Sequence, residues 1–294
     1  MVNVVNLLFQ FLDSFAFIVL AAIGLAIIFG MMGVINLAHG EFIMVGAYGT
    51  TLAYNAGAPL LLSIPVGVLA TTVMGLVLER SVVRRLYDRP LDSMVATFAL
   101  GLALTQLTRI VFGNSLSSIG IPLGSVQYGQ FSYSMYRVLL SSVALAVLAA
   151  AYVVFTRTEF GIRARATIQD ADTASAMGVE TDRMYTVTFG IGSALAGLTG
   201  ALYAPTMSIV PGMGSSFLVE AFVAVVTGGA SVLLGTTLAG GGLGLVNALF
   251  SNVYGTFIGQ IALLFVAVLI LRFLPNGLSG AVEGVRERME RENT

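Results

Sequence analysis

The stretch "SFAFIVLAAIGLAIIFGMMGV", Ser14–Val34, decides the fold class, because it is strongly apolar and carries no charged residue. About 20 apolar residues in a helix cross the hydrocarbon core of a bilayer. The sequence therefore predicts an all-α integral membrane protein, a polytopic bundle of about eight or nine transmembrane helices. The other predicted spans are 40–56, 60–79, 93–112, 137–156, 184–206, 217–234, 236–253 and 257–274.

The composition supports a membrane protein. The 294 residues are 57% hydrophobic and only 10% charged, whereas charged residues make up about 25% of an ordinary soluble domain. The net charge of -1 indicates no nucleic-acid partner, and the absence of cysteine excludes disulfides and thiolate metal sites. We expect one transmembrane domain over 1–294, embedded in the lipid bilayer.

All fourteen basic residues are arginine, and the chain has no lysine. A P-loop needs its lysine to reach the phosphates of a nucleotide, and a Schiff base forms only on a lysine. The sequence therefore predicts no ordinary P-loop and no lysine imine in this chain. We expect a transport protein without an ATPase site, enzymatic activity or cofactor of its own. If ATP drives the protein, a partner chain must hydrolyse it.

Arginine clusters predict the orientation, because basic residues are enriched on the cytoplasmic side. We expect three cytoplasmic segments, which contain Arg80, Arg84, Arg85 and Arg89; Arg157, Arg163, Arg165 and Arg183; and Arg286, Arg288 and Arg291. The polar loop 113–136 should lie outside, with Arg109 and Arg137 at its borders extending to the membrane interface. Three spans before Arg80 would place the N-terminus outside. A re-entrant 40–56, which is short and contains several glycines, would place it inside.

Directly after the first run comes "GVINLAHGEFIMVGAY", Gly33–Tyr48, which contains the only histidine of the chain. A site for catalysis or a metal is disfavoured, because His39 and Glu41 have no third ligand nearby. Two interpretations remain open. Asn36, His39 and Glu41 either bind backbone groups released where a helix breaks near 36–40, or line a path for a solute. The interpretations overlap, because irregular backbone inside a membrane must be covered by protein or line a cavity.

The loop 157–183 is the strongest cytoplasmic feature. Residues 164–177 are predicted to form one short amphipathic helix, with Gly178 ending it in the left-handed conformation that glycine tolerates. Thr181 is the predicted N-cap of the next span. The helix either lies on the membrane surface or docks into a partner protein.

Glycine-rich segments predict close helix packing or helix breaks. "TGGASVLLGTTLAGGGLG", Thr227–Gly244, has the pattern of two helices that meet at a break. A weak internal similarity relates the segments that begin "FGMMG" at Phe29 and "FGIGS" at Phe189. Transporters often contain such repeats, with the substrate site at their broken helices.

Together, "GVINLAHGEFIMVGAY", the loop "TEFGIRARATIQDADTASAMGV" and the glycine-rich segment resemble the membrane subunits of ATP-binding-cassette importers for branched-chain amino acids, urea and short amides. The resemblance runs from about Gly24 to Gly277. Such importers often carry a Glu-Ala-Ala-x-x-x-Gly pattern in the cytoplasmic loop. Here Asp172 and Gly178 keep its spacing. Ser231-Val232 replaces the Gly-Ser that is common after the glycine pair.

The resemblance implies a permease subunit in the inner membrane of a bacterium. The implied partners are a second related permease, two cytoplasmic ATPases and an extracytoplasmic substrate-binding protein. The implied mechanism is alternating access, with ATP hydrolysed by the partner subunits. The residues expected to couple this chain to the ATPases are Glu159, Gly161, Arg165, Asp172, Ala174 and Gly178.

The resemblance is closer to the urea branch, through the segments Glu79–Gly113 and Phe217–Gly229. The second segment places Glu220 inside a predicted span, where an acid is a functional candidate. An ionised carboxylate accepts hydrogen bonds and would suit the N–H groups of urea, but would repel the carboxylate of an amino acid. We therefore expect urea or a short amide as cargo. The alternatives are branched-chain amino acids and, in a different class, a passive channel for small solutes.

Overall fold

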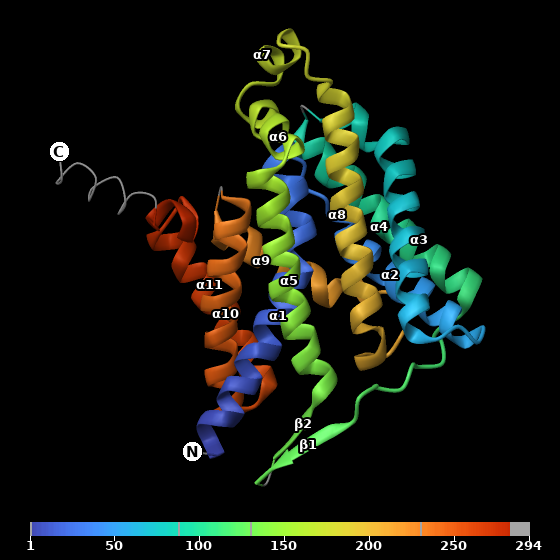
Figure 1. Ribbon diagram of the computed structural model, residues 1–294, viewed down its shortest axis with the longest axis vertical. Helices are drawn as coiled ribbons and strands as arrows, with labels where there is room; N and C mark the ends of the chain where they lie inside the picture. Colours follow the sequence, from blue (N-terminus) through green and yellow to red (C-terminus); the bar gives the residue numbers. More distant parts are fainter. Residues whose placement is uncertain (1, 88, 130, 230, 283–294) are drawn as a thin grey trace, which may run out of the picture. The chain divides into compact units, whose positions relative to one another are not determined.

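The computed structural model describes residues 2–87, 89–129, 131–229 and 231–282. The predicted cytoplasmic arginines Arg286, Arg288 and Arg291 lie outside these residues. The regular elements of the described chain are helices, apart from one short hairpin (Figure 1). Its elements are α1 (Val2–Met32), α2 (His39–Asn55), α3 (Leu60–Ser81), η1 (Val83–Leu86), α4 (Pro90–Phe112), β1 (Ser125–Tyr128), β2 (Phe131–Ser134), α5 (Met135–Arg157), α6 (Glu159–Gln169), α7 (Ala171–Ala176), α8 (Thr181–Tyr203), η2 (Ala204–Thr206), α9 (Gly214–Gly228), α10 (Val232–Tyr254) and α11 (Thr256–Phe273).

Seven of the described helices are long and apolar enough to cross a membrane, namely α1, α3, α4, α5, α8 with its η2 extension, α10 and α11. The helix α9 is apolar but shorter, and α2 has only 17 residues. The prediction of a polytopic all-α membrane protein is therefore confirmed.

Several predicted boundaries were wrong. The first helix begins at Val2 rather than near Ser14. The predicted span 217–234 is the helix Gly214–Gly228, which ends before the glycine-rich break. The next helix begins at Val232, so the expected break between two helices in this segment is confirmed, with Gly229 in the left-handed region.

The chain divides into two compact units. The first unit comprises the described residues of 1–22, 123–149 and 220–294, and the second unit comprises 23–122 and 150–219. The prediction of one permease domain stays a prediction.

The second unit is built on α2, α3 and α8, which pack against one another. The buried positions of α3 are Ser63, Gly67, Thr71, Gly75 and Glu79, at strict four-residue spacing. Small residues on one face of a helix let backbones approach closely. A Cβ added to Gly197 of α8 would lie 2.8 Å from the Cβ of Thr71. The opposite face of α3 exposes apolar side chains such as Leu69 and Val73.

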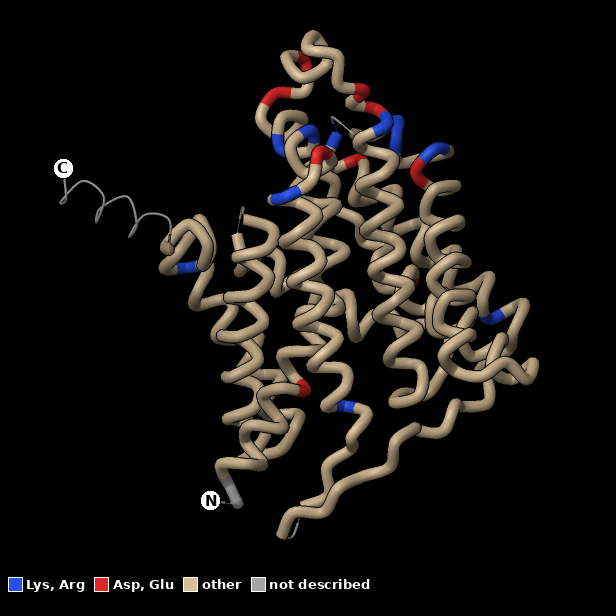
Figure 2. Tube along the Cα trace, in the orientation of Figure 1, with Lys and Arg blue, Asp and Glu red and all other residues tan. Residues whose placement is uncertain are grey.

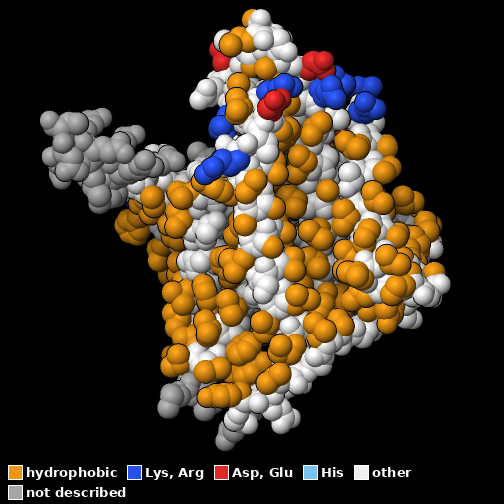
Figure 3. All heavy atoms as spheres, in the orientation of Figure 1, with side chains coloured by type: hydrophobic (Ala, Val, Ile, Leu, Met, Phe, Trp, Pro, Cys, Tyr) orange, Lys and Arg blue, Asp and Glu red, His pale blue; other side chains and the backbone are white. Residues whose placement is uncertain are grey.

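This pattern is inverted relative to a soluble protein, because small and polar residues lie inside and large apolar ones lie outside. Apolar side chains cover the sides of the second unit's helices in Figure 3. Charged residues of this unit gather at the end formed by α6, α7, the start of α8 and the end of α3 (Figure 2). Apolar sides with a charged end are the surface expected of lipid-embedded helices.

Two of the predicted cytoplasmic arginine segments therefore meet at one end of the second unit. Arg84, after α3, forms an ion pair with Asp182 at the start of α8. Within this unit, the last part of α1 runs towards the end where the arginines gather, which we call the arginine end. Gly24 faces Gly192 of α8, whereas Met31, later in α1, accepts a hydrogen bond from Thr188, which lies nearer the start of α8. The chain then runs away along α2 and back along α3. This order gives three helical segments before Arg80, and the side on which the N-terminus lies stays a prediction.

The first unit contains the start of α1, the β1–β2 hairpin, most of α5, and α10 with α11. Gly240 and Gly244 of α10 pack against Phe15 of α1. The hairpin strands are antiparallel and pair Ser125 with Ser134 and Tyr128 with Phe131. This hairpin occupies the polar loop that the sequence places outside.

Candidate functional site

The helix break predicted near 36–40 is present and lies in the second unit. The helix α1 ends at Met32, Gly33 takes a left-handed φ of +63°, and α2 begins at His39. Glycine tolerates this conformation because it has no Cβ. The break lies inside the packed helices, since Asn36 and His39 are 1% and 0% exposed.

Side chains satisfy the backbone groups that the break releases. The Oδ1 atom of Asn36 accepts a hydrogen bond of 3.0 Å from the amide of Ala38. Thr97 of α4 accepts a bond of 3.0 Å from the amide of Leu37, and its hydroxyl lies 3.2 Å from the carbonyl oxygen of Ile35. A buried backbone group without a partner is costly in a membrane, so these contacts hold the opened chain.

Glu41 lies in the first turn of α2 and is buried, with 9% of its surface exposed. An acid at this position is stabilised by the positive end of the helix dipole. Its carboxylate accepts a long hydrogen bond of 3.5 Å from the hydroxyl of Thr105 on α4. It also lies over Gly101, where an added Cβ would be 3.1 Å from Oε2. Within the described residues, no arginine forms an ion pair with Glu41.

His39 is the first residue of α2 and packs against α1. A Cβ added to Gly24 would lie 3.1 Å from its Cε1 atom. The next residue, Gly40, meets Gly214 at the start of α9, and a Cβ on either glycine would overlap the other's backbone. Two short helices thus begin side by side, each after an interruption of the chain. The two weakly similar segments differ in structure, because the one that begins at Phe29 contains the break after α1 whereas the one that begins at Phe189 continues unbroken along α8 to Tyr203.

The second unit therefore brings Asn36, His39 and Glu41 together around one break. Glu220, the fourth predicted path residue, lies on α9 and belongs to the first unit. It is half-buried, and within the described residues it forms no hydrogen bond or ion pair. The role of these four residues as a solute path stays a prediction.

Thr97 and Thr105 were not predicted from the sequence, although both contact the break residues. They belong to a series at four-residue spacing on α4, namely Ser93, Thr97, Gly101 and Thr105. This spacing places them on one helical face. The same spacing on α3 is the signal that could have identified the inward faces of both helices.

The predicted coupling region is two helices rather than one. Asp170 interrupts the helix expected over 164–177, because its side chain accepts a hydrogen bond of 2.9 Å from the amide of Thr173 and caps α7. This hydrogen bond lowers the pKa of Asp170 below its ordinary value. Gly178 follows α7 with a left-handed φ of +91°, as predicted. The predicted cap at Thr181 was wrong, since Glu180 takes the N-cap position and makes no side-chain cap bond.

The six predicted coupling residues fall into two groups. Three are explained by local structure. Gly161 has no room for a Cβ beside the carbonyl groups of α5, Arg165 donates a hydrogen bond to the carbonyl of Phe155, and Ala174 is buried at 3% exposure. Glu159 pairs with Arg163 over 3.2 Å at the exposed start of α6. Asp172 and Gly178 are exposed.

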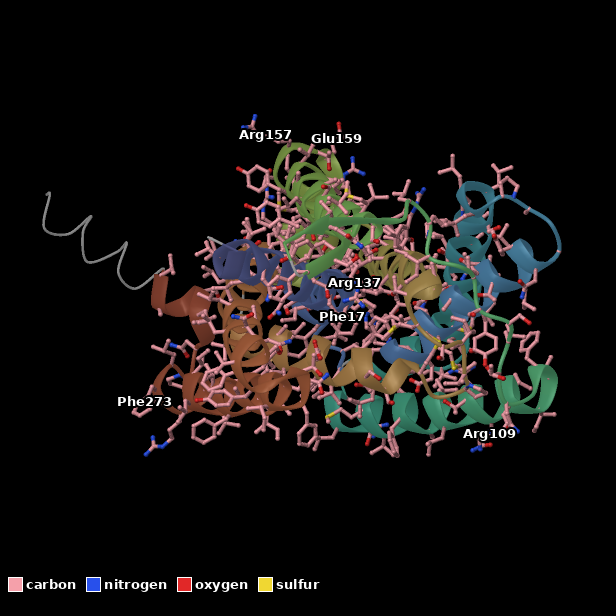
Figure 4. All side chains as sticks on the ribbon, turned by 90° about the horizontal axis from the view of Figure 1, so that it is seen from below. Phe17, Arg109, Arg137, Arg157, Glu159 and Phe273 are labelled. Atoms are coloured by element: carbon pink, nitrogen blue, oxygen red, sulfur yellow. The ribbon has the colours of Figure 1, made fainter. Side chains whose placement is uncertain are left out.

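Exposed apolar side chains mark the surface of this region. Ile162, Ile168 and Met177 are 60%, 45% and 82% exposed. We call these three residues the apolar tip. They lie among charged residues at the arginine end of the second unit, where Figure 4 shows Arg157 and Glu159 near each other at the junction of α5 and α6. Exposed apolar side chains beside charges are typical of protein contact surfaces.

A cavity of about 770 Å³ lies beside Gly178, between the end of α3 and the start of α8. Next to it, the buried carboxylate of Glu79 accepts hydrogen bonds from the hydroxyls of Tyr87 and Thr186, the latter at 3.2 Å. Burial and the bond to Glu79 raise the pKa of Tyr87. This network ties the end of α3 and Tyr87, the residue after η1, to α8, and it was not predicted from the sequence.

Residues 7–274 of the chain match the model of a known protein family, "Branched-chain amino acid transport system / permease component". The chain is 27% identical over 281 residues to the high-affinity branched-chain amino acid transport system permease protein BraD of Pseudomonas aeruginosa, covering 90% of this chain and 92% of BraD. It is 29% identical over 289 residues to LivH of Escherichia coli K12, with 90% and 91% covered.

A further relative is the probable branched-chain amino acid transport permease protein LivH of Methanocaldococcus jannaschii, at 26% identity over 283 residues, with 90% and 88% covered. No solved structure matches the chain significantly. These comparisons give no support to the expected closeness to urea permeases.

Proposed function

Because the chain belongs to the family of branched-chain amino acid transport permease components, we propose that it is a permease subunit of an ATP-binding-cassette importer for branched-chain amino acids. It is a multi-pass protein of the bacterial inner membrane. The observation that carries the proposal is the family match over nearly the whole chain, including the break after α1 and the cytoplasmic helices.

The proposed cargo, branched-chain amino acids, differs from the urea or short amide expected from the sequence. That expectation used the repulsion between Glu220 and the carboxylate of an amino acid. An amino acid also carries an ammonium group, which a carboxylate attracts at short range. Glu220 therefore does not discriminate against amino acids, and the named relatives favour branched-chain cargo.

In the proposed complex, the apolar tip on α6 and α7 contacts a cytoplasmic ATPase. Binding and hydrolysis of ATP by two such ATPases would move the tip, and α5 and α8 would carry that motion into the membrane. A second permease would complete the cavity, and an extracytoplasmic binding protein would deliver the amino acid. The chain itself supplies no lysine for a P-loop.

The break between α1 and α2 is the proposed element of the path. Broken helices in transporters place helix termini and irregular backbone at the solute. Asn36, His39 and Glu41 of the second unit would shape this element, and Glu220 is the further acid proposed for the path. Alternating access would then expose the path to one side of the membrane at a time.

The experiment is uptake into proteoliposomes that contain this chain with the permease, ATPases and binding protein encoded beside it. We expect ATP-dependent uptake of leucine, isoleucine and valine. Uptake of urea or acetamide without uptake of leucine would overturn the proposed cargo. Leucine uptake that continues without ATP would favour a passive channel instead.

The docking of the apolar tip is tested by Met177→Glu, with Met177→Leu as the matched control. Met177 is 82% exposed, so neither change should affect folding. We expect the glutamate variant alone to lose the ATPases during affinity purification. Equal recovery of ATPases with both variants would contradict the docking role.

A further inference from the structure

A second polar cavity lies in the first unit, away from the break residues in the sequence. Its volume is about 290 Å³, just below the roughly 300–1,000 Å³ that is usual for small-molecule sites. It is formed by the N-terminal part of α1, the strand β2 and the start of α5. The polar residues in its lining are Asn6, Gln10, Asp13, Ser132, Tyr133, Ser134 and Arg137.

One wall of this cavity carries a pair of opposite charges. Arg137 of α5 forms an ion pair with Asp13 of α1. The side chains are 51% and 31% exposed, so a small solute can reach both. Figure 4 shows Arg137 beside α1, whereas Arg109 points away from α4. The expectation that Arg137 extends to the membrane interface stays a prediction, and the ion pair with Asp13 is a contact that the sequence did not predict.

Two buried oxygen atoms in the lining have no hydrogen-bond partner among the described residues. They are Oε1 of Gln10 and Oγ of Ser134. Buried polar atoms in proteins are nearly always hydrogen-bonded, so their state needs an explanation. Both can accept hydrogen bonds, and both line the cavity that contains the carboxylate of Asp13.

The other wall is aromatic and held in place. The ring of Tyr133 stacks on Phe9 with centroids 4.0 Å apart, and Phe131 lies 6.2 Å from Tyr133. The hydroxyl of Tyr133 donates to Asn6 over 3.4 Å, and Asn6 in turn donates to Asn252 of α10 over 2.6 Å. These contacts fix an apolar surface next to the charged pair.

We propose that this cavity binds a zwitterionic α-amino acid with an apolar side chain. The ammonium group, which has three donors, is bound by the carboxylate of Asp13 together with Gln10 Oε1 and Ser134 Oγ. The carboxylate is bound by the guanidinium of Arg137, which suits a carboxylate with two parallel hydrogen bonds. The apolar side chain packs on Phe9, Phe131 and Tyr133. In the absence of solute, the two charged residues pair with each other.

The proposal rests on the proposed function, which supplies the class of cargo. It adds a site outside the break around Asn36. Because the loop 113–136 is expected outside, the cavity would receive the amino acid on the external side, before the solute enters the path. An entry site of this kind raises the affinity of uptake and leaves the chemistry of the ATPases unchanged.

The test uses the complete importer in lipid nanodiscs without its binding protein, with radiolabelled leucine as the probe. We expect Asp13→Asn and Arg137→Gln each to weaken leucine binding by about tenfold or more, which corresponds to about 1.4 kcal/mol. Leucinol lacks the carboxylate, so wild type should prefer leucine over leucinol and Arg137→Gln should lose that preference. Arg109→Gln is the matched arginine control and should bind leucine like wild type.

The double exchange Asp13→Arg with Arg137→Asp separates binding from packing. It keeps an ion pair but places the cation beside Gln10 and Ser134, so we expect folding without recovery of leucine binding. Wild-type affinity in the exchange variant or in Asp13→Asn would overturn the proposed site. Leucine uptake by the wild-type importer tests the proposed function separately. If the KM for leucine uptake is unchanged in Asp13→Asn and in Arg137→Gln, the proposed binding site is refuted and the proposed function is not.

Discussion

Gly40, in the first turn of α2, touches Gly214, the first residue of α9, so closely that neither position has room for a methyl group. The two residues lie far apart in the chain, and each follows an interruption. This contact fixes the starting points of both helices relative to each other within the second unit.

We expect Gly40→Ala to destabilise the protein by at least about 1–3 kcal/mol, the ordinary cost of overpacking a core, because the added methyl would overlap backbone rather than a flexible side chain. The measurement is the thermal unfolding midpoint of the purified chain in detergent. Gly241→Ala in α10 is the matched control, since no atom of the described residues lies within 4 Å of its added Cβ. A midpoint for Gly40→Ala equal to that of the control would show that the two helix starts are not in contact.

Thr97→Val removes the hydroxyl that braces the break after α1. The amide of Leu37 then loses its acceptor inside the protein, and an unsatisfied buried donor costs about 1–3 kcal/mol. We expect reduced thermal stability and faster hydrogen exchange over residues 33–38. Thr72→Val provides the control, because the hydroxyl of Thr72 bonds only to Val68 of its own helix. Unchanged exchange at the break in the Thr97 variant would contradict the bracing role.

Asp170 should make the helix α7 sensitive to pH. Its pKa is lowered by the hydrogen bond from the Thr173 amide, so the cap stabilises α7 above the ordinary pKa of 3.8. That stabilisation is lost as the pH falls through the lower folded-state pKa. Hydrogen exchange over residues 171–177 should therefore be slow at pH 7 and faster near pH 3.

The matched variant is Asp170→Asn, because asparagine caps helices about as well as aspartate and does not titrate. It should retain slow exchange at both pH values once intrinsic rates are corrected. The control Asp172→Asn should still show the pH effect. A wild-type protein with equal protection at both pH values would rule out the cap as the titrating element.

Gly178 should tolerate asparagine better than valine. Its φ of +91° is left-handed, which costs other residues roughly 1–2 kcal/mol, and asparagine is among those that enter this region more readily. We expect Gly178→Val to reduce leucine uptake by the reconstituted importer more than Gly178→Asn does. Equal uptake by the two variants would show that coupling to the ATPases does not depend on the left-handed backbone conformation at Gly178.

The sequence predicted most helices and both breaks, because long apolar runs and glycine-rich interruptions are local signals. The boundaries were less accurate where polar residues extend a helix, as they do at the start of α1. The coupling helix was predicted as one element because its apolar pattern continues across Asp170. The break there is made by the side chain of Asp170, which caps α7. It was not predicted because an aspartate can lie either inside a helix or at its start.

The supporting residues of the site could not be predicted in the same way. Thr97 bonds to Leu37 across 60 positions of sequence, and Thr186 bonds to Glu79 across 107. Such contacts depend on which helices pack together, and no local pattern specifies that. The inward faces of α3 and α4 were nevertheless encoded, as small and polar residues repeated every four positions. The relationship between Asp13 and Arg137 was hidden because each residue alone resembles an interfacial charge.

The bracing of the break by Thr97 has a mechanical consequence. Since Thr97 contacts Ile35 and Leu37 at once, α4 cannot slide by one helical turn past the start of α2 without leaving an amide unpaired in an apolar surrounding. A shift of α4 past the break would therefore cost about 1–3 kcal/mol for the unsatisfied amide of Leu37, so this contact opposes independent movement of the two segments.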